Sequence, residues 1–384
     1  MVNPFQTNIL DCVLTCPIGL ENVTADGISP FCSEILINKG KIAFKADIES
    51  VYKINLYSRT GMHLLIKIMD AKAENTDQLY KTTFDYPWHE WIEPIDTFSI
   101  RSRIKSKNIN NSNYATLKVK DAIVDRIFKQ VGNRPNIEKI NPRYSLFLFI
   151  IENKVNIYLN SSGQPLFKRG YREKIHKASM NEALAAGILL LSKWNKEEPL
   201  YDPMCGSGTF SLEAAMLGRN IPPGYYRKEF AFQKWHYFNN RLWNNIKKAA
   251  REKFSHKRLF IYGFDNIPAN ILLSKQNARR ILIHNSILFK NAEISDFNPE
   301  NSGTIIMNPP YGERIGDDES LIDLYKTIGD VLKSNCHGSN SYIFTGNKEL
   351  IKYIGLKSEK KVILKNGKID CRLLYYPIRE GKYS

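Results

Sequence analysis

Apolar residues in the first 160 positions follow two alternating periods, one typical of strands and one typical of helices. From 100 to 107, basic side chains alternate with apolar or small ones, which predicts a strand whose basic residues share one face. Residues 115–131 carry apolar side chains at helical spacing and are followed by a Gly-Asn-Arg-Pro sequence, so a helix is expected to end there. The apolar runs 144–151 and 155–159 predict a hairpin. The first part of the chain is therefore predicted to be an α+β region.

The segment 161–178 has a different composition, rich in Ser, Gly and basic residues, and predicts a linker that leads back into the fold. Ser179 and Glu182 have the S-x-x-E spacing of a capping box, so a helix is expected from there through 183–191. The linker is thus predicted to separate the α+β region from a second domain that begins with a helix.

After residue 191, short β-rich runs alternate with helical patterns, which is typical of a parallel sheet with crossover helices. The runs are 199–201, 259–263, 304–307 and 341–344. Near the end, Asn366-Gly367 separates 361–365 from 368–376 and predicts a hairpin with a type I′ turn. The sheet is therefore expected to close with an antiparallel pair.

The length and net charge of the chain indicate how many domains it has and what kind of partner it binds. A chain of 384 residues predicts two or three domains, and its formal net charge of +16 indicates a polyanionic partner. Residues 98–143 hold 11 Lys and Arg against 3 acidic residues, so part of the excess is local. The sequence shows neither a membrane-spanning apolar run nor a signal peptide, which predicts a soluble, cytoplasmic protein. The 6 cysteines form no C-x-x-C pair, so free thiols and no metal site are expected.

A glycine-rich turn follows the run 199–201, in the sequence Asp202-Pro203-Met204-Cys205-Gly206-Ser207-Gly208-Thr209. A strand that leads into such a turn and then a helix lets a ligand approach the backbone closely, which favours a nucleotide-like cofactor over a plain tight turn. The third glycine of a dinucleotide motif is replaced by Ser211. Asp202 would repel a pyrophosphate, whereas it suits a ligand that bears an ammonium group.

Two further acidic residues are candidates for the same ligand. Asp265 follows the run 259–263 and could accept hydrogen bonds from both hydroxyls of a ribose, or it could cap the helix that follows. Glu293 lies in a less clear strand region and could contact an adenine or simply be solvated.

Asn308-Pro309-Pro310-Tyr311 follows the apolar run 304–307. Transfer of a methyl group to an exocyclic base amine needs acceptors for the two N–H hydrogens, and the Asn308 side chain and Pro309 carbonyl can supply both. Pro310 has no N–H and a fixed φ, which holds the preceding carbonyl in place. Tyr311 offers a ring for stacking on a base that has left its helix. The alternative is an ordinary Asn-Pro turn after a buried strand.

The two motifs together resemble the THUMP-containing family of class I S-adenosylmethionine-dependent methyltransferases. The resemblance is in particular to bacterial enzymes that are similar to the 23S rRNA guanine-N2 methyltransferase and are often labelled N6-adenine-specific DNA methylases. It rests on D-P-x-C-G-S-G-T and N-P-P-Y-G-E-R, and it spans roughly 165 to 376, where further matching segments begin at Phe167, Arg219, Phe230, Thr345 and Asn366. The first 160 residues resemble a ferredoxin-like segment and a THUMP module more weakly.

The resemblance implies a Rossmann-like, seven-stranded and mostly parallel α/β sheet behind an α+β region. The implied domains are a ferredoxin-like segment at 1–65, a THUMP-like RNA-binding domain at 66–160, the linker 161–178 and the methyltransferase domain at 179–384. It implies S-adenosylmethionine as cofactor and ribosomal RNA as partner, with a single methylation. The implied cofactor residues are Asp202, Cys205, Gly206, Gly208, Thr209, Asp265, Glu293 and Asn308.

The implied catalytic residues are Asn308, Pro309, Pro310 and Tyr311, and the RNA-binding candidates are Arg101, Arg103, Lys105, Lys168, Arg169 and Arg172. Position 293 is Glu where many relatives carry Asp. Two alternatives stay open: a DNA adenine-N6 methyltransferase, because N-P-P-Y accommodates adenine equally well, and an RNA-binding protein without catalysis. The separate segment 165–384 is expected to keep the cofactor but to lose its preference for structured rRNA.

Overall fold

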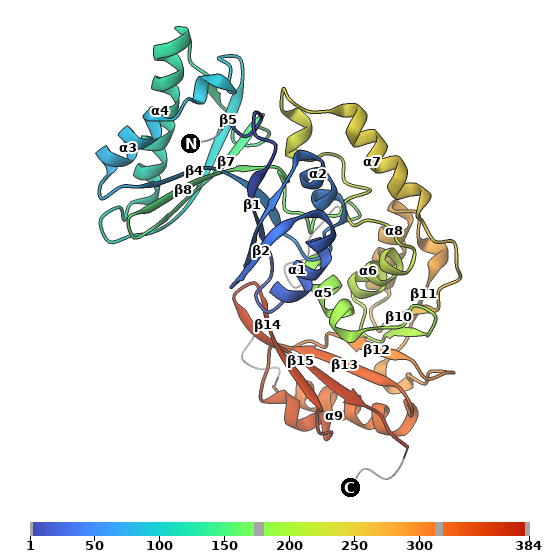
Figure 1. Ribbon diagram of the computed structural model, residues 1–384. Helices are drawn as coiled ribbons and strands as arrows, with labels where there is room; N and C mark the ends of the chain where they lie inside the picture. Colours follow the sequence, from blue (N-terminus) through green and yellow to red (C-terminus); the bar gives the residue numbers. More distant parts are fainter. Residues whose placement is uncertain (1–2, 173–179, 312–317, 381–384) are drawn as a thin grey trace.

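The computed structural model describes residues 3–172, 180–311 and 318–380, which form two lobes, each built on one sheet (Figure 1). The sheet of the N-terminal lobe has eight strands among the described residues. Their order across the sheet is β2 (Ser33–Asn38), β3 (Lys41–Ala46), β1 (Leu10–Thr15), β4 (His63–Lys72), β8 (Lys154–Asn160), β7 (Tyr144–Ile151), β5 (Thr97–Lys105) and β6 (Asn136–Ile137). Strand β4 runs across the predicted domain boundary after residue 65, so the two N-terminal regions share one sheet.

The helices of this lobe are α1 (Glu21–Ile28), α2 (Ile48–Tyr57), α3 (Thr76–Asp85) and α4 (Ser112–Val131). The predicted helix is α4. It begins where the Asn111 side chain accepts a hydrogen bond from the Tyr114 N–H, and it ends at Gly132, whose φ of 77° suits the glycine that closes a helix. The predicted hairpin is confirmed as the antiparallel pair β7 and β8.

The second sheet confirms the mostly parallel arrangement. Its order is β11 (Ile287–Asn291), β10 (Ile261–Asp265), β9 (Leu200–Asp202), β12 (Thr304–Met307), β13 (Asn340–Thr345), β15 (Ile369–Pro377) and β14 (Lys360–Asn366). Every residue of β12 is buried, as expected for a parallel strand that is covered on both faces. Ile306 belongs to the core shared with α5 (Glu182–Ser192), α6 (Thr209–Gly218) and α8 (Pro268–Arg280), whereas Ile305 faces the core under α9 (Asp318–Asn335).

Two local predictions need correction. The closing antiparallel pair β14 and β15 is present, but Asn366 pairs with Ile369, so the loop is Gly367-Lys368. Of these two, only Gly367 has a positive φ (62°), which fits a type II′ turn and excludes type I′. The helix α5 is capped by Asn181, whose side chain accepts from the Leu184 N–H, while Ser179 of the predicted capping box lies outside the described residues.

A long segment between α6 and β10 belongs to the core of the other lobe. It contains a short 3₁₀ turn (Ala231–Lys234) and α7 (Asn240–Glu252). The Phe232 ring stacks on Tyr52 of α2 with centroids 4.4 Å apart, and the Trp243 ring meets Phe232 edge-on at 5.2 Å. The imidazole of His236 lies 2.9 Å from a carboxylate oxygen of the buried Asp96. One hydrophobic cluster therefore joins the N-terminal lobe to this part of the chain.

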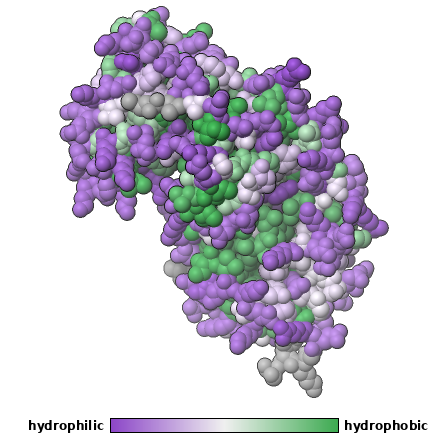
Figure 2. Space-filling view, viewed as in Figure 1, coloured by the Kyte–Doolittle hydropathy of each residue, from purple (hydrophilic) through white to green (hydrophobic). Residues whose placement is uncertain are grey.

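The visible surface is mainly hydrophilic over the lobe that carries α3 and α4, and it is apolar around the middle of the molecule (Figure 2). The edge strand β2 contributes Leu36 and Ile37, which are 62% and 45% exposed. A register shift at the start of β2, where Glu34 has a φ of 51°, distorts this edge. Such bulges discourage pairing with further strands. Within the described ranges, no helix combines the length and apolar character needed to cross a membrane.

Candidate active site

Three polar side chains lie at the carboxyl ends of neighbouring parallel strands. Asp265 ends β10, Asp202 ends β9 and Asn308 directly follows β12. These strands are adjacent in the order β10, β9, β12. Because open α/β sheets bind ligands outside the carboxyl ends of their strands, the fold brings these sequence-predicted positions to the ligand-binding edge.

Asp202 is a fully buried carboxyl group with one satisfied oxygen. The Ser211 hydroxyl donates to Oδ2 at 2.9 Å, whereas Oδ1 has no hydrogen-bond partner among the described residues. Burial raises the pKa of the Asp202 carboxyl to about 7; the Asp265 carboxylate adds a smaller increase, and the hydrogen bonds from Ser211 oppose it. A cationic ligand group would compensate the negative charge that burial disfavours.

The turn between β9 and α6 depends on two glycines in the left-handed region, with φ of 54° at Gly206 and 82° at Gly208. The Gly208 N–H donates to the Cys205 carbonyl at 2.8 Å, and the Ser274 hydroxyl donates to the Gly206 carbonyl at 2.8 Å. Cys205 and Thr209 are both buried. A Cβ on Gly206 would meet no heavy atom within 4 Å, so a ligand can approach the backbone there.

Asp265 accepts three hydrogen bonds from the protein. Its Oδ2 accepts from the Gly206 N–H at 2.9 Å. Its Oδ1 accepts from the Ile267 N–H at 3.0 Å and from Asn270 Nδ2 at 2.9 Å. The hydrogen bond from the Ile267 N–H shows that Asp265 holds the backbone at the start of α8, which was the helix-capping alternative to ribose binding in the sequence analysis. Two carboxylate oxygens offer about four acceptor positions, so about one is left for a ligand hydroxyl. Asp265 therefore fixes the glycine turn as well as offering an acceptor.

Glu293 lies just beyond β11, the strand that was unclear from the sequence. Its side chain is exposed, and its Oε2 accepts a hydrogen bond from Asn266 Nδ2 at 3.2 Å. Asn266 directly follows Asp265, so Glu293 lies at the same sheet edge, on the solvent side of Asp265.

The Asn308–Tyr311 segment continues this edge beyond β12. Asn308 is half-buried, and its Oδ1 is a buried atom with no hydrogen-bond partner among the described residues. Pro309 is buried and Pro310 is exposed. The Tyr311 hydroxyl accepts a hydrogen bond from Asn366 Nδ2 at 3.1 Å, which ties it to the β14–β15 hairpin. The Gly-Glu-Arg continuation of this motif at 312–314 lies outside the described residues.

Comparison with known proteins agrees with this geometry. Residues 169–375 match the RMKL-like methyltransferase domain, residues 73–160 match the THUMP domain and residues 11–65 match the RlmL ferredoxin-like domain. The chain belongs to the RMKL-like family of S-adenosylmethionine-dependent methyltransferases.

Relatives match this methyltransferase over nearly its whole length. A Synechocystis protein provisionally named an RNA methyltransferase, slr0064, is 34% identical over 363 residues, which are 94% of each chain. The ribosomal RNA large subunit methyltransferase K/L of Syntrophotalea carbinolica is 33% identical over 96% of this chain but 54% of its own length, so this chain spans about half of that relative. The crystal structure of SMU.472, provisionally described as a methyltransferase and solved with SAH, has a TM-score of 0.87 and 27% identity, and the match covers 98% of this chain and 100% of SMU.472.

The residues at the sheet edge fit S-adenosylmethionine. Asp202 Oδ1, buried and without a partner among the described residues, suits the ammonium of the methionine portion. The open space at Gly206 admits the ligand beside the backbone, and Asp265 retains acceptor capacity for ribose. In the described part of the chain, no group of three His, Cys, Asp or Glu side chains is arranged to hold a metal ion.

Two polar residues that support this site were not predicted. Ser211 is visible in the sequence only as a departure from a glycine motif, and its bond to Asp202 requires the folded turn. Asn270 lies five residues after Asp265, in the first turn of α8, and its side-chain amide donates to Asp265 Oδ1. Spacing alone could have suggested Asn270, because it follows a candidate carboxylate into the next helix.

The predicted RNA-binding residues separate into two groups. Arg101, Arg103 and Lys105 are exposed at alternate positions of β5, as the period of two predicted. Lys168 is exposed as well, and its ammonium donates to Gln164 Oε1 at 3.1 Å. All four are accessible to a polyanion.

Arg169 and Arg172 point inward, and their assignment to RNA contact is wrong for this structure. The Arg169 side chain is 1% exposed and lies 3.4 Å from a Glu213 oxygen. The Arg172 side chain is 7% exposed, pairs with Glu182 at 3.3 Å and donates to the Thr209 hydroxyl. Burial leaves neither guanidinium free to reach a phosphate. Instead, Arg172 supports the glycine turn.

Proposed function

We propose that this methyltransferase transfers a methyl group to an exocyclic base amine of ribosomal RNA, namely guanine N2 of 23S rRNA. The observation that carries the proposal is the side-chain oxygen of Asn308. It is a buried acceptor without a partner among the described residues, and it follows the strand next to the one that ends in Asp202. A buried acceptor without a donor is costly, so its presence at a ligand edge supports a donor supplied by the substrate.

Bound S-adenosylmethionine supplies an electrophilic methyl group on its sulfonium. The Asn308 side-chain oxygen and the Pro309 carbonyl accept the two N–H hydrogens of the base amine, which turns the nitrogen lone pair away from conjugation with the ring. As the bond from this nitrogen to the methyl carbon forms, the bond from that carbon to sulfur breaks, S-adenosylhomocysteine leaves, and the nitrogen loses one of its protons. Pro310 lacks an N–H and holds the Pro309 carbonyl in a fixed direction. Tyr311 offers a ring on which the displaced base stacks. Catalysis therefore comes from alignment and electrostatics, without a covalent enzyme intermediate.

RNA is favoured over DNA as the substrate by the THUMP match at 73–160 and by relatives named as RNA or ribosomal RNA methyltransferases. The exposed basic face of β5 lies in that matched region. Intact Asn308–Tyr311 favours an enzyme over an RNA-binding protein without catalysis. A ribosomal substrate implies action in the cytoplasm.

Mass spectrometry of nucleosides tests the proposal directly. A strain that lacks the gene should lose N2-methylguanosine from 23S rRNA, and the wild-type gene should restore it while the Asn308→Ala gene should not. Loss of N6-methyladenine from DNA instead would support the adenine alternative. Unchanged nucleosides in both RNA and DNA would refute the proposed reaction.

A further inference from the structure

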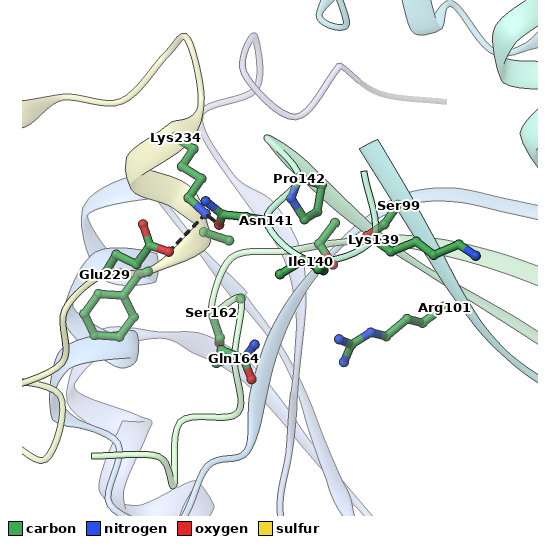
Figure 3. A pocket seen from close by; sticks show the side chains of 14 residues that line it. Ser99, Arg101, Lys139, Ile140, Asn141, Pro142, Ser162, Gln164, Glu229 and Lys234 are labelled. Atoms are coloured by element: carbon green, nitrogen blue, oxygen red, sulfur yellow. Dashed lines mark hydrogen bonds and ion pairs between the residues drawn. The ribbon is translucent and has the colours of Figure 1, made fainter. Parts of the chain in front are cut away.

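A hollow lies where the THUMP strands meet the catalytic part of the chain (Figure 3). One side is formed by Ser99 and Arg101 of β5 and Ser145 of β7. The other side is formed by the turn at 162–164 and by residues 229–231 with Lys234. Residues 139–142, between β6 and β7, complete the lining. None of the lining residues belongs to the active site, so this is a separate feature of the surface.

The side chains around this junction hollow carry more positive than negative charge. Its charged lining residues are Arg101, Lys139, Lys234 and Glu229. Lys234 is neutralised, because its ammonium lies 3.1 Å from Glu229 and also contacts Asn141. Arg101 and Lys139 are both exposed and have no ion pair or hydrogen bond with any described residue. Two cationic groups are therefore available to a ligand.

Arg101 is directed into the hollow. In Figure 3 its guanidinium points toward the 162–164 turn, whereas the Lys139 side chain extends in the opposite direction. Beneath that turn, Arg227 donates to the carbonyls of Ser162 and Gln164 at 3.3 and 3.0 Å. Arg101 and Arg227 both help to lower the pKa of the nearby, half-buried His63 to about 4, although burial is the larger cause. This charge favours an anion in the hollow.

We propose that the junction hollow binds a backbone phosphate of the RNA substrate, with Arg101 as the main contact and Lys139 adding positive charge beside it. This inference rests on the proposed function. A guanidinium forms paired hydrogen bonds with phosphate oxygens, and the partly buried Ser145 hydroxyl adds a neutral donor nearby. Because residues 229–231 and Lys234 belong to the methyltransferase match but pack in the core of the N-terminal lobe, a phosphate held there fixes the position of the RNA relative to Asn308.

Arg101 should contribute more to RNA binding than the two other basic residues that the alternating sequence pattern places on the same face of β5. Arg103 and Lys105 lie on the same strand and the same face as Arg101, but neither lines the hollow. A diffuse basic surface would use all three residues to a similar extent. A built phosphate site depends on Arg101 and Lys139 and is nearly independent of the other two.

The test compares two double variants of the full chain that remove equal charge, Arg101→Ala with Lys139→Ala and Arg103→Ala with Lys105→Ala. Binding to a 23S rRNA transcript is measured over a range of salt concentrations. The hollow variant should bind roughly tenfold or more weakly near physiological salt, with a salt slope reduced by about 0.7 to 0.9 for each lost phosphate contact. The control variant should lose less than about threefold. Arg101→Lys should recover part of the slope.

Calorimetry with S-adenosylhomocysteine should give the same affinity for both double variants, which excludes misfolding as the cause. Equal weakening by the two double variants, or no weakening by the hollow variant, would overturn the phosphate site while wild-type methylation of rRNA still supported the proposed function. Wild-type protein that binds duplex DNA as tightly as the transcript and methylates its adenine would overturn both.

Discussion

The raised pKa of Asp202 predicts that cofactor binding depends on pH in the neutral range. Without ligand the carboxyl has a pKa of about 7, because it is fully buried and one oxygen has no partner among the described residues. A bound ammonium stabilises the carboxylate and lowers this pKa. Binding below pH 7 therefore releases a proton, and the affinity must rise with pH until the free carboxyl is ionised.

The size of the effect follows from the ionised fraction. With a free pKa of about 7, about 9% of the carboxyl is ionised at pH 6 and about 90% at pH 8. Affinity for S-adenosylhomocysteine should therefore increase about tenfold between these two values, which is about 1.4 kcal/mol. About 0.9 proton should be released per complex at pH 6 if the carboxylate stays ionised when bound.

Calorimetric titration of the full chain in buffers of different ionisation enthalpy measures both quantities. Asp202→Asn keeps the shape but cannot titrate, so it should bind more weakly and show only the pH dependence of the ligand itself. Glu300→Gln removes an exposed carboxyl from the loop before β12 and should retain the wild-type profile. A wild-type affinity that is flat from pH 6 to pH 8 with no proton release would refute the ammonium assignment.

Three further outcomes are expected. Asp202→Asn should raise the free energy of unfolding of the ligand-free protein at pH 8 by at most about 4 kcal/mol, measured by chemical unfolding. The reason is that the pKa of the Asp202 carboxyl is near 7 in the folded state and near 3.8 in the unfolded state, so the wild type loses stability as pH rises between these values. Equal stability of the two proteins at pH 8 would contradict this. Asn308→Ala should lower kcat about 100-fold or more in single-turnover assays and leave cofactor affinity nearly intact, so a normal rate would exclude the amine-acceptor role. Asp265→Ala should weaken S-adenosylhomocysteine binding by about 1.5 to 3 kcal/mol and also lower the melting temperature, because Gly206, Ile267 and Asn270 each lose an acceptor; unchanged calorimetric affinity would argue against ribose binding.

Motifs at strand ends were predictable because they depend on local sequence. Asp202, Asp265 and Asn308 each follow a short apolar run, and the topology of a parallel sheet brings such positions to one edge. That these three residues lie at one sheet edge could therefore be predicted from the sequence. Their hydrogen-bond partners could not be predicted, because Ser211 reaches Asp202 only in the folded turn.

Burial of charged side chains was not predictable from the linker composition. Arg169 and Arg172 lie in a basic, Gly-containing stretch, a composition that predicts exposure to solvent. Their partners, Glu213 for Arg169 and Glu182 for Arg172, lie in helices that only the tertiary fold brings next to them. The predicted type of the hairpin turn was wrong for a different reason. Asn366-Gly367 favours type I′ locally, but the ladder pairs Asn366 with Ile369 and moves the loop by one residue.

The expected independence of segment 165–384 conflicts with the shared core. Removing the preceding residues would expose Phe230, Phe232, Trp235 and Trp243, which are all at most 5% exposed in the full chain. It would also delete Tyr52, on which Phe232 stacks, and Asp96, which holds His236. The catalytic segment therefore cannot be tested separately, and loss of RNA recognition has to be measured with point variants of the full chain.

This shared core also constrains the order in which the nascent chain can fold. The strands of the first sheet are complete once residue 160 has been synthesised, but the Phe232 and Trp243 rings that contact Tyr52 are made about 70 to 80 residues later. At a synthesis rate of about 5 to 20 residues per second, this leaves a delay of about 4 to 16 s. During that interval the N-terminal lobe exposes an apolar surface at α2, and it reaches its final stability only when α7 has emerged from the ribosome.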